Sequence, residues 1–129
     1  MGLFDRLRGR RRVPAPAAGG GDGRAARAET TAHLAEFARS RVGVEGYVEP
    51  ATAQNPVTLM LVATDGEWTR RRVPDERAGH ALARELGIPV YDVQRVGYPQ
   101  RVRDWNSRQR ILARRTAAER AARRAAERS

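Results

Sequence analysis

The stretch "NPVTLMLVATDGEWTRRRVP", residues 55–74, has the clearest pattern of hydrophobic and polar positions in the chain. Residues 57–63 are apolar on both alternating faces, which is typical of a central strand that is covered on both sides. Asp65-Gly66 follows and is a strong signal for a hairpin with a two-residue turn. The expected partners across this hairpin are Ala63 with Trp68, Leu61 with Arg70, Leu59 with Arg72, Val62 with Thr69, Met60 with Arg71 and Thr58 with Val73.

The second strand of the hairpin carries three consecutive arginines. Side chains alternate between the two faces of a strand, so Arg70 and Arg72 share one face while Arg71 lies on the other. The triplet is therefore not a single basic patch. Trp68 is expected to pack beside Ala63.

The best-defined helix lies in "PDERAGHALARELGIP", residues 74–89. Asp75 is placed to cap the first turn, Gly87 suits the left-handed conformation that follows a helix, and Pro89 blocks continuation. The inner face of this helix is expected to consist of Ala78, Ala81, Leu82, Glu85 and Leu86.

Weaker patterns place the other elements of the predicted domain. Residues 24–41 read as a helix that Gly43 ends, and residues 44–49 read as a short strand. Residues 90–95 supply another strand. The order of strand, helix and strand between residues 67 and 96 fits a right-handed crossover.

The last helix is expected to begin near Arg101. The residues expected to dock it on the sheet are Val102, Trp105, Ile111 and Leu112. No large apolar residue follows Ala113, so this end of the chain is predicted to be a solvated helix that projects from the domain. A protein partner is one expected ligand of this helix.

Together these patterns predict an α+β fold. The fold is expected to contain a small mixed sheet with a β-hairpin and a strand–helix–strand crossover, flanked by helices, and a projecting C-terminal helix. The expected organisation is a basic head and flexible linker at residues 1–23, a single domain at residues 24–112 and a solvated basic helical tail at residues 113–129.

The charge of the chain is concentrated at its two ends. All 25 basic residues are arginine, and the formal net charge is +10. Residues 1–12 carry five Arg and one Asp, and residues 114–129 carry six Arg and two Glu, so each end has a net charge of +4 and the rest only +2. A basic excess of this kind predicts a polyanionic partner, either nucleic acid or an anionic membrane surface.

The composition also limits the chemistry and the compartment. The chain has no cysteine, which excludes disulfides, thiolate metal sites and thiol redox chemistry. No apolar run is long enough to cross a membrane, and the first residues lack the apolar core of a secretory signal. We expect a cytoplasmic protein, with a peripheral position at the membrane as the alternative.

The head, "MGLFDRLRGRRR", has two interpretations. Leu3, Phe4 and Leu7 have helical spacing and could lie on an anionic bilayer with the arginines at the headgroups, or the segment is a frayed terminus. Gly21, Gly23 and Ala26 match the pattern G-x-G-x-x-A, but no strand precedes them, and a dinucleotide site requires one.

No catalytic or metal-binding motif stands out elsewhere. His33 and His80 each follow a glutamate by four residues, which is typical of a surface pair on a helix, and there is no cluster of metal ligands. We therefore expect no metal and no cofactor.

The segment "GYPQRVRDWNSRQR", residues 97–110, interleaves aromatic residues with arginines. Stacking of bases on Tyr98 and Trp105, with guanidinium contacts to phosphates, would suit single-stranded nucleic acid. In the other interpretation, which we favour, Tyr98-Pro99 turns the chain and Trp105 belongs to the core, because a chain with two Trp and two Phe has few large aromatics to spare.

Three stretches, "GVEGYVEPAT", "LVATDGEWTRRRV" and "IPVYDVQRVGYPQRVRDW", resemble a family of small actinobacterial proteins of unknown function. The resemblance covers residues 42–105. It implies a single small domain, and the oxidoreductase label that some members carry implies a cofactor-dependent enzyme. The chain itself offers no redox motif in support of that label.

The residues favour a non-enzymatic binding or adaptor protein whose arginine-rich ends engage a polyanion, and the alternative is the oxidoreductase-like enzyme. The candidate polyanion-binding residues are Arg6, Arg8, Arg10, Arg11, Arg12, Arg70, Arg72, Arg101, Arg103, Arg108, Arg110, Arg114, Arg115, Arg123 and Arg124.

Overall fold

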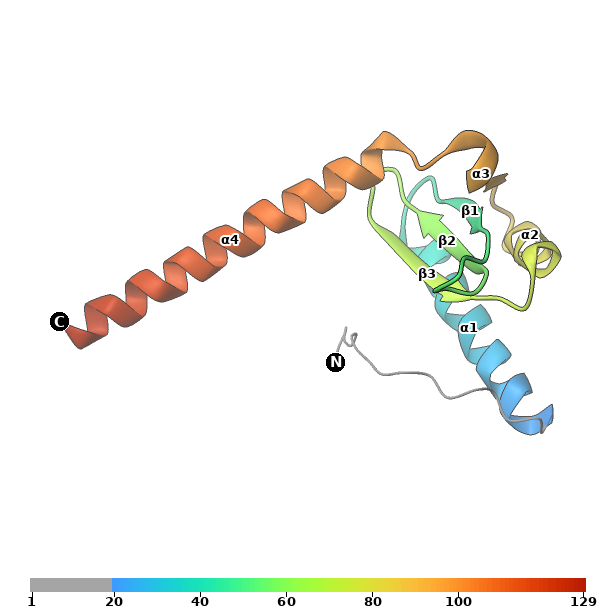
Figure 1. The fold of residues 1–129 in the computed structure, drawn as a ribbon, viewed down its shortest axis with the longest axis horizontal. Helices are drawn as coiled ribbons and strands as arrows, with labels where there is room; N and C mark the ends of the chain where they lie inside the picture. Colours follow the sequence, from blue (N-terminus) through green and yellow to red (C-terminus); the bar gives the residue numbers. More distant parts are fainter. Residues whose placement is uncertain (1–19) are drawn as a thin grey trace. The chain divides into compact units, whose positions relative to one another are not determined.

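The computed structural model describes residues 20–129 of the chain (Figure 1). The chain divides into two compact units after Ala32, and the sheet belongs to the second unit, His33–Ser129. The elements are α1 (Gly20–Ser40), β1 (Glu45–Glu49), β2 (Thr58–Val62), β3 (Trp68–Arg72), α2 (Glu76–Glu85), β4 (Val90–Asp92), α3 (Val93–Val96) and α4 (Gln100–Arg128).

The strands form one mixed sheet in the order β3-β2-β1-β4. β1 is antiparallel to β2 and parallel to β4, and β3 is antiparallel to β2. The connection from β3 to β4 runs through α2 and passes over the two central strands, so it is a strand–helix–strand crossover. The predicted α+β fold with a hairpin and a C-terminal helix is confirmed.

The hairpin between β2 and β3 forms, but its predicted register is wrong by one residue. Val62 lies opposite Trp68 and Met60 lies opposite Arg70, so Trp68 does not pair with Ala63. The loop has three residues, 64–66, and Gly66 has a positive φ of 94°. This arrangement is typical of a three-residue hairpin loop that ends in a glycine bulge.

Two hydrogen bonds explain the longer loop. The amide of Gly66 donates to the carbonyl of Ala63 at 2.9 Å, and the amide of Ala63 donates to the carbonyl of Glu67 at 2.8 Å. The carboxylate of Asp65 accepts a hydrogen bond from the amide of Glu67 at 3.0 Å. In a two-residue turn this amide would instead pair with the backbone of the facing strand.

The sheet is covered on both faces, as the apolar pattern of residues 57–63 predicted. On one face α1 and α2 pack against a cluster that contains Leu59, Leu61 and Val48. On the other face Val102 of α4 packs against a smaller cluster that contains Met60 and Val62. Apolar burial of this extent on both faces of β2 is the main stabilising contribution to the domain.

The ends of α2 are as predicted, and its inner face is as predicted in part, because Leu82 and Leu86 pack against the core. Asp75 caps the helix by accepting the amide of Ala78 at 2.8 Å, and Gly87 adopts a φ of 74°. The buried residues of α2 are Gly79 and Ala83, whereas Ala81 and Glu85, which were expected on the inner face, are exposed.

The small residues on α2 let the helix approach the sheet closely. A Cβ at Gly79 would lie 3.3 Å from a methyl group of Val48. On the facing strand, a Cβ at Gly46 would lie 3.4 Å from the Cβ of Ala83. The close contact between α2 and the sheet therefore depends on small residues. A prediction based on large apolar side chains could not identify it.

Two other predicted boundaries differ from the structure. α1 begins at Gly20 rather than Arg24, because helix formation is cooperative and extends from the alanine-rich residues into neighbours of lower propensity. β4 ends at Asp92, whose carboxylate accepts the amide of Gln94 at 3.0 Å and starts the turn of α3, so residues 93–95 are not a strand.

The docking of α4 is shorter than expected. Val102 is buried and Trp105 is half-buried, but Ile111 and Leu112 are 40% and 50% exposed and do not dock the helix on the sheet. From Arg108 to the end of α4 every residue is exposed. The buried contact of α4 with the domain is therefore limited to its first two turns.

Gly66 provides a test of how closely the hairpin loop packs against α4. A Cβ at Gly66 would overlap the carbonyl oxygen of Arg101 and lie 2.9 Å from the Cβ of Trp105. We expect Gly66→Ala to lower the free energy of unfolding by about 2 to 4 kcal/mol, from strain at positive φ together with overlap.

Gly87→Ala is the matched control for this experiment. Gly87 also has a positive φ, but a Cβ there would have no neighbour within 4 Å, so only the conformational strain of about 1 to 2 kcal/mol is expected. Urea denaturation of both variants measures the difference. Equal destabilisation by the two substitutions would contradict close packing of the loop against α4.

Candidate functional site

The most buried charged group in the described part of the domain is the carboxylate of Glu49, at the end of β1. Its residue is only 7% exposed. Arg70 of β3 donates to both carboxylate oxygens, from Nε at 2.9 Å and from Nη2 at 2.7 Å. The hydroxyls of Thr58 and Tyr98 each donate at 2.6 Å. The carboxylate is thus fully satisfied by four hydrogen bonds.

These contacts determine the ionisation of Glu49. Burial raises the pKa of the Glu49 carboxyl, but the hydrogen bonds from Arg70, Thr58 and Tyr98 outweigh it, so the pKa lies below the ordinary value of 4.5. Burial, followed by the hydrogen bond to the Glu49 carboxylate, raises the pKa of the Tyr98 hydroxyl. Glu49 is therefore a carboxylate at neutral pH, and it holds Arg70 rather than leaving it for an external anion.

A second ion pair joins α4 to the same face of the sheet. Nη2 of Arg101 lies 2.6 Å from Oε1 of Glu45, and the hydroxyl of Tyr47 donates to that oxygen at 2.9 Å. Nε of Arg101 donates to the carbonyl of Ala63 at 3.0 Å. Arg101, a candidate polyanion-binding residue, is therefore occupied within the fold.

The aromatic residues of segment 97–110 take part in the fold. The ring of Trp68 donates from Nε1 to Asn106 at 2.9 Å. The guanidinium of Arg108 lies 5.8 Å from the centre of the Trp105 ring and donates to the carbonyl of Asp65 at 2.7 Å. Trp105 is half-buried against the hairpin loop and belongs to neither core cluster, so the expectation of a core residue is met only in part.

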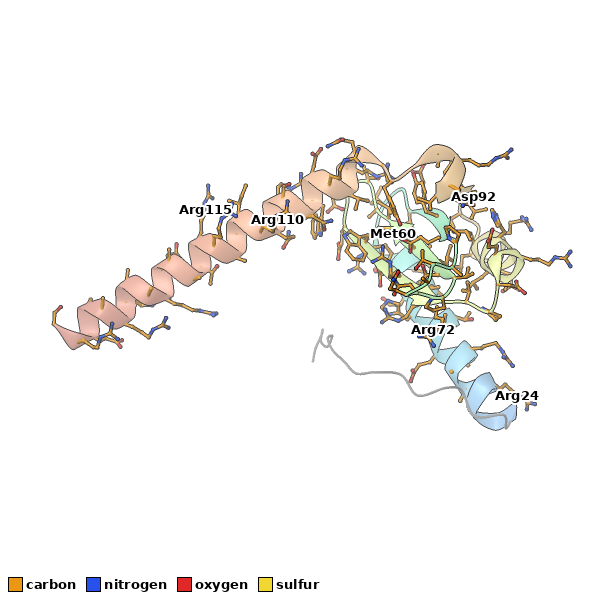
Figure 2. All side chains as sticks on the ribbon, viewed as in Figure 1. Arg24, Met60, Arg72, Asp92, Arg110 and Arg115 are labelled. Carbon is orange, nitrogen blue, oxygen red and sulfur yellow. The ribbon has the colours of Figure 1, made fainter. Side chains whose placement is uncertain are left out.

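The remaining candidate arginines of the described region lie on exposed parts of α4 and β3. Arg103 donates to the side chain of Gln100, and Arg110 donates to Ser107 at 3.1 Å, so both make contacts only along their own helix. Figure 2 shows Arg110 and Arg115 on the outside of α4. The other exposed candidates are Arg72, Arg114, Arg115, Arg123 and Arg124.

The exposed part of α4 has the charge expected of an anion-binding segment. Residues 114–129 contain six Arg and two Glu, and none of them is buried. Ile111 and Leu112 precede this segment, and no large apolar residue lies within it. We call residues 114–128 the basic segment of α4. Alanine pairs recur every four residues from Ala117 to Ala126, so at 100° per residue the alanines share one side of the helix. Arg120, Arg123 and Arg124 lie on the other side.

Sequence reasoning did not find the hollow between α1 and β3. Its volume is about 220 Å³. The residues that line it are His33, Glu36, Phe37, Arg41, Glu67, Trp68 and Thr69. Only the fold brings these side chains together, because the two elements are separated by more than 20 residues of chain and neither carries a recognisable ligand motif.

His33 belongs to this hollow and is half-buried rather than a surface residue. Its Nε2 lies 2.8 Å from the hydroxyl of Thr69, and its Nδ1 lies 3.4 Å from Nη2 of Arg71. Burial, followed by the charges of Arg71 and Arg41, holds the pKa of His33 below the ordinary value of 6.5. The imidazole is therefore neutral at pH 7.

Arg41 also lines the hollow. Its Nη2 lies 2.7 Å from Oε2 of Glu67, and its guanidinium lies 4.4 Å from the centre of the Phe37 ring. The hollow therefore has an aromatic wall and polar groups that already have partners within the fold.

Other sequence features lie outside any site. Arg6, Arg8, Arg10, Arg11 and Arg12, and the apolar residues of the head, fall outside the residues that the structure describes. Gly21, Gly23 and Ala26 lie within α1, and no described strand precedes them. Between residues 20 and 129 no three His, Asp or Glu side chains are placed to hold a metal ion.

The described helices were also tested for the ability to span a membrane, and the chain was compared with known proteins. Within the same range no helix combines the length and the apolar character that crossing a bilayer requires. Comparison of the chain with protein-family models, curated proteins and solved structures found no match. The resemblance to an actinobacterial family stays an expectation.

The Glu49 network makes the stability of the domain depend on pH. The pKa of Glu49 is depressed in the folded state, so its contribution is fully present above pH 4.5 and is lost as the pH falls through the folded pKa. We expect Glu49→Gln to lower the free energy of unfolding at pH 7 by about 2 to 4 kcal/mol, less than for a fully buried pair because the Arg70 side chain is 42% exposed.

Glu36→Gln is the control, because Glu36 pairs with Arg39 on the surface of α1. That substitution is expected to change stability by less than about 0.5 kcal/mol. Denaturation measured between pH 7 and pH 3 should show a smaller acid loss in Glu49→Gln than in the unmodified protein. An unchanged pH profile would show that Glu49 does not contribute to acid sensitivity.

Proposed function

We propose that the protein is a non-enzymatic binding module that engages the phosphate backbone of nucleic acid through the basic segment of α4. The observation that carries the proposal is the contrast between two sets of arginines. Arg70, Arg101 and Arg41 pair with carboxylates of the domain. The basic segment exposes six arginines with only two glutamates among them.

Nucleic acid is favoured over an anionic membrane surface by the composition of this segment. A helix that lies in a membrane interface buries an apolar face among the headgroups. The basic segment has only alanine as its apolar residue, so it has no large apolar side chain to bury there. Arginine binds phosphate with its planar fork, and phosphate contacts do not require sequence readout. A cytoplasmic location, which belongs to this proposal, would give access to such ligands.

The proposal has a quantitative test. We expect the full chain with R114Q, R115Q, R123Q and R124Q together to bind a fluorescein-labelled DNA duplex at least tenfold more weakly than the unmodified protein at low salt. The dependence of log Kd on log salt should also become shallower, by about 0.9 for each lost phosphate contact. Fluorescence anisotropy between low and physiological salt measures both quantities.

The matched control changes the same number of charges elsewhere. R24Q, R77Q, R84Q and R95Q remove four exposed arginines outside the basic segment. This variant is expected to retain the salt dependence of the unmodified protein. Equal loss in both variants would mean that only the net charge matters, and binding to phosphatidylserine vesicles but not to the duplex would favour the membrane. Either result would overturn the proposal.

A further inference from the structure

β3 is an edge strand with unpaired backbone groups. Within residues 33–129 it pairs only with β2. The amide of Ala63 donates to the carbonyl of Glu67, and the amide of Val73 donates to the carbonyl of Val57. Backbone groups alternate along an antiparallel strand, so the even-numbered residues of β3 direct their amides away from β2.

The outward amides belong to Trp68, Arg70 and Arg72. One outward carbonyl, that of Arg70, accepts Nη1 of Arg71 at 2.9 Å. An edge of this kind can accept another strand, unless its side chains prevent the approach. The charge and size of the β3 side chains therefore determine which strands can pair with this edge.

The second half of β3 consists of three exposed arginines. Arg70 is held by Glu49 but stays 42% exposed on its side chain, and the guanidinium of Arg72 makes no hydrogen bond or ion pair with the part of the chain that the structure describes. Figure 2 labels Arg72 at the end of this strand. Positive charge along the edge repels basic strands and complements acidic ones.

The hollow of about 220 Å³ lies beside the first half of the same strand, because Trp68 and Thr69 line it. The ring of Phe37 lies among the lining residues, whereas the ring of Trp68 packs on the opposite face of the sheet with Met60 and Val62. Peptides that add to a sheet edge gain affinity from backbone hydrogen bonds and specificity from pockets that take alternate side chains. β3 thus offers an open edge, complementary charge and a receptor for one apolar side chain along a single strand.

We propose that β3 binds an extended acidic peptide of a partner protein, which adds to the sheet as a fifth strand. Its backbone pairs with the outward amides, one apolar side chain enters the hollow, and a carboxylate faces Arg72. The proposal does not depend on nucleic-acid binding by the basic segment, which lies elsewhere on the chain.

The experiment uses the full chain and a fluorescein-labelled peptide of sequence EDELEVEDE. The comparison peptide has the same side chains but N-methyl groups on alternate backbone amides, which block strand pairing and leave the charge unchanged. We expect the methylated peptide to bind at least tenfold more weakly, because several backbone hydrogen bonds are lost and each contributes about threefold to tenfold. Equal binding of both peptides, or binding of neither, would overturn the proposal.

Two substitutions at one position separate charge from backbone pairing. R72A removes the charge and keeps the outward amide, whereas R72P also removes that amide at a position where an edge strand tolerates proline. We expect R72P to weaken peptide binding by about threefold to tenfold relative to R72A. Identical affinities for the two variants would show that the edge is not used.

Amide hydrogen exchange of the unmodified protein gives a readout that requires no substitution. Addition of the peptide is expected to slow exchange at Trp68, Arg70 and Arg72, and unchanged exchange there would contradict strand addition. The variant with R114Q, R115Q, R123Q and R124Q is expected to retain peptide binding. If it loses the peptide and the duplex together, both ligands act at the basic segment and the assignment of the peptide to β3 is wrong.

Discussion

The carboxylate of Glu49 is the charged group around which β1, β2, β3 and the turn before α4 are arranged. Its oxygens accept Arg70 from β3, Thr58 from β2 and Tyr98 from the segment that leads into α4. A buried carboxylate without these donors would carry a desolvation penalty of several kcal/mol. The network therefore stabilises the one relative arrangement of these four segments in which all the hydrogen bonds form, and other arrangements are higher in free energy.

The register of the hairpin illustrates this constraint. A shift of one residue moves every side chain of a strand to the opposite face. In the observed register Arg70 shares a face with Glu49, because Met60 lies opposite Arg70 and Tyr47 lies opposite Met60. In the register predicted from the sequence, Arg70 would lie opposite Leu61, on the face that α1 and α2 cover.

Much of the fold could be predicted from the sequence, and the errors have identifiable physical causes. The hairpin, the capped helix and the crossover follow from strong local signals at Asp75, Gly87 and residues 57–63. The register could not be predicted, because β2 is apolar on both faces and burial alone does not distinguish two registers. The buried positions Gly79 and Ala83 of α2 were missed because a glycine and an alanine carry little hydrophobic signal. The hollow beside β3 depends on tertiary contacts that no local pattern encodes.

The short docking of α4 has a consequence for how the protein meets other molecules. The 15 residues of the basic segment would extend along about 23 Å of helix at 1.5 Å per residue. Residues 114–129 carry a net charge of +4 and residues 13–113 only +2, so the charge is distributed unevenly between the basic end and the domain. In the field of a polyanion this asymmetry exerts a torque that turns the basic end toward the ligand before contact, so encounters are oriented and their rate falls steeply as salt is added.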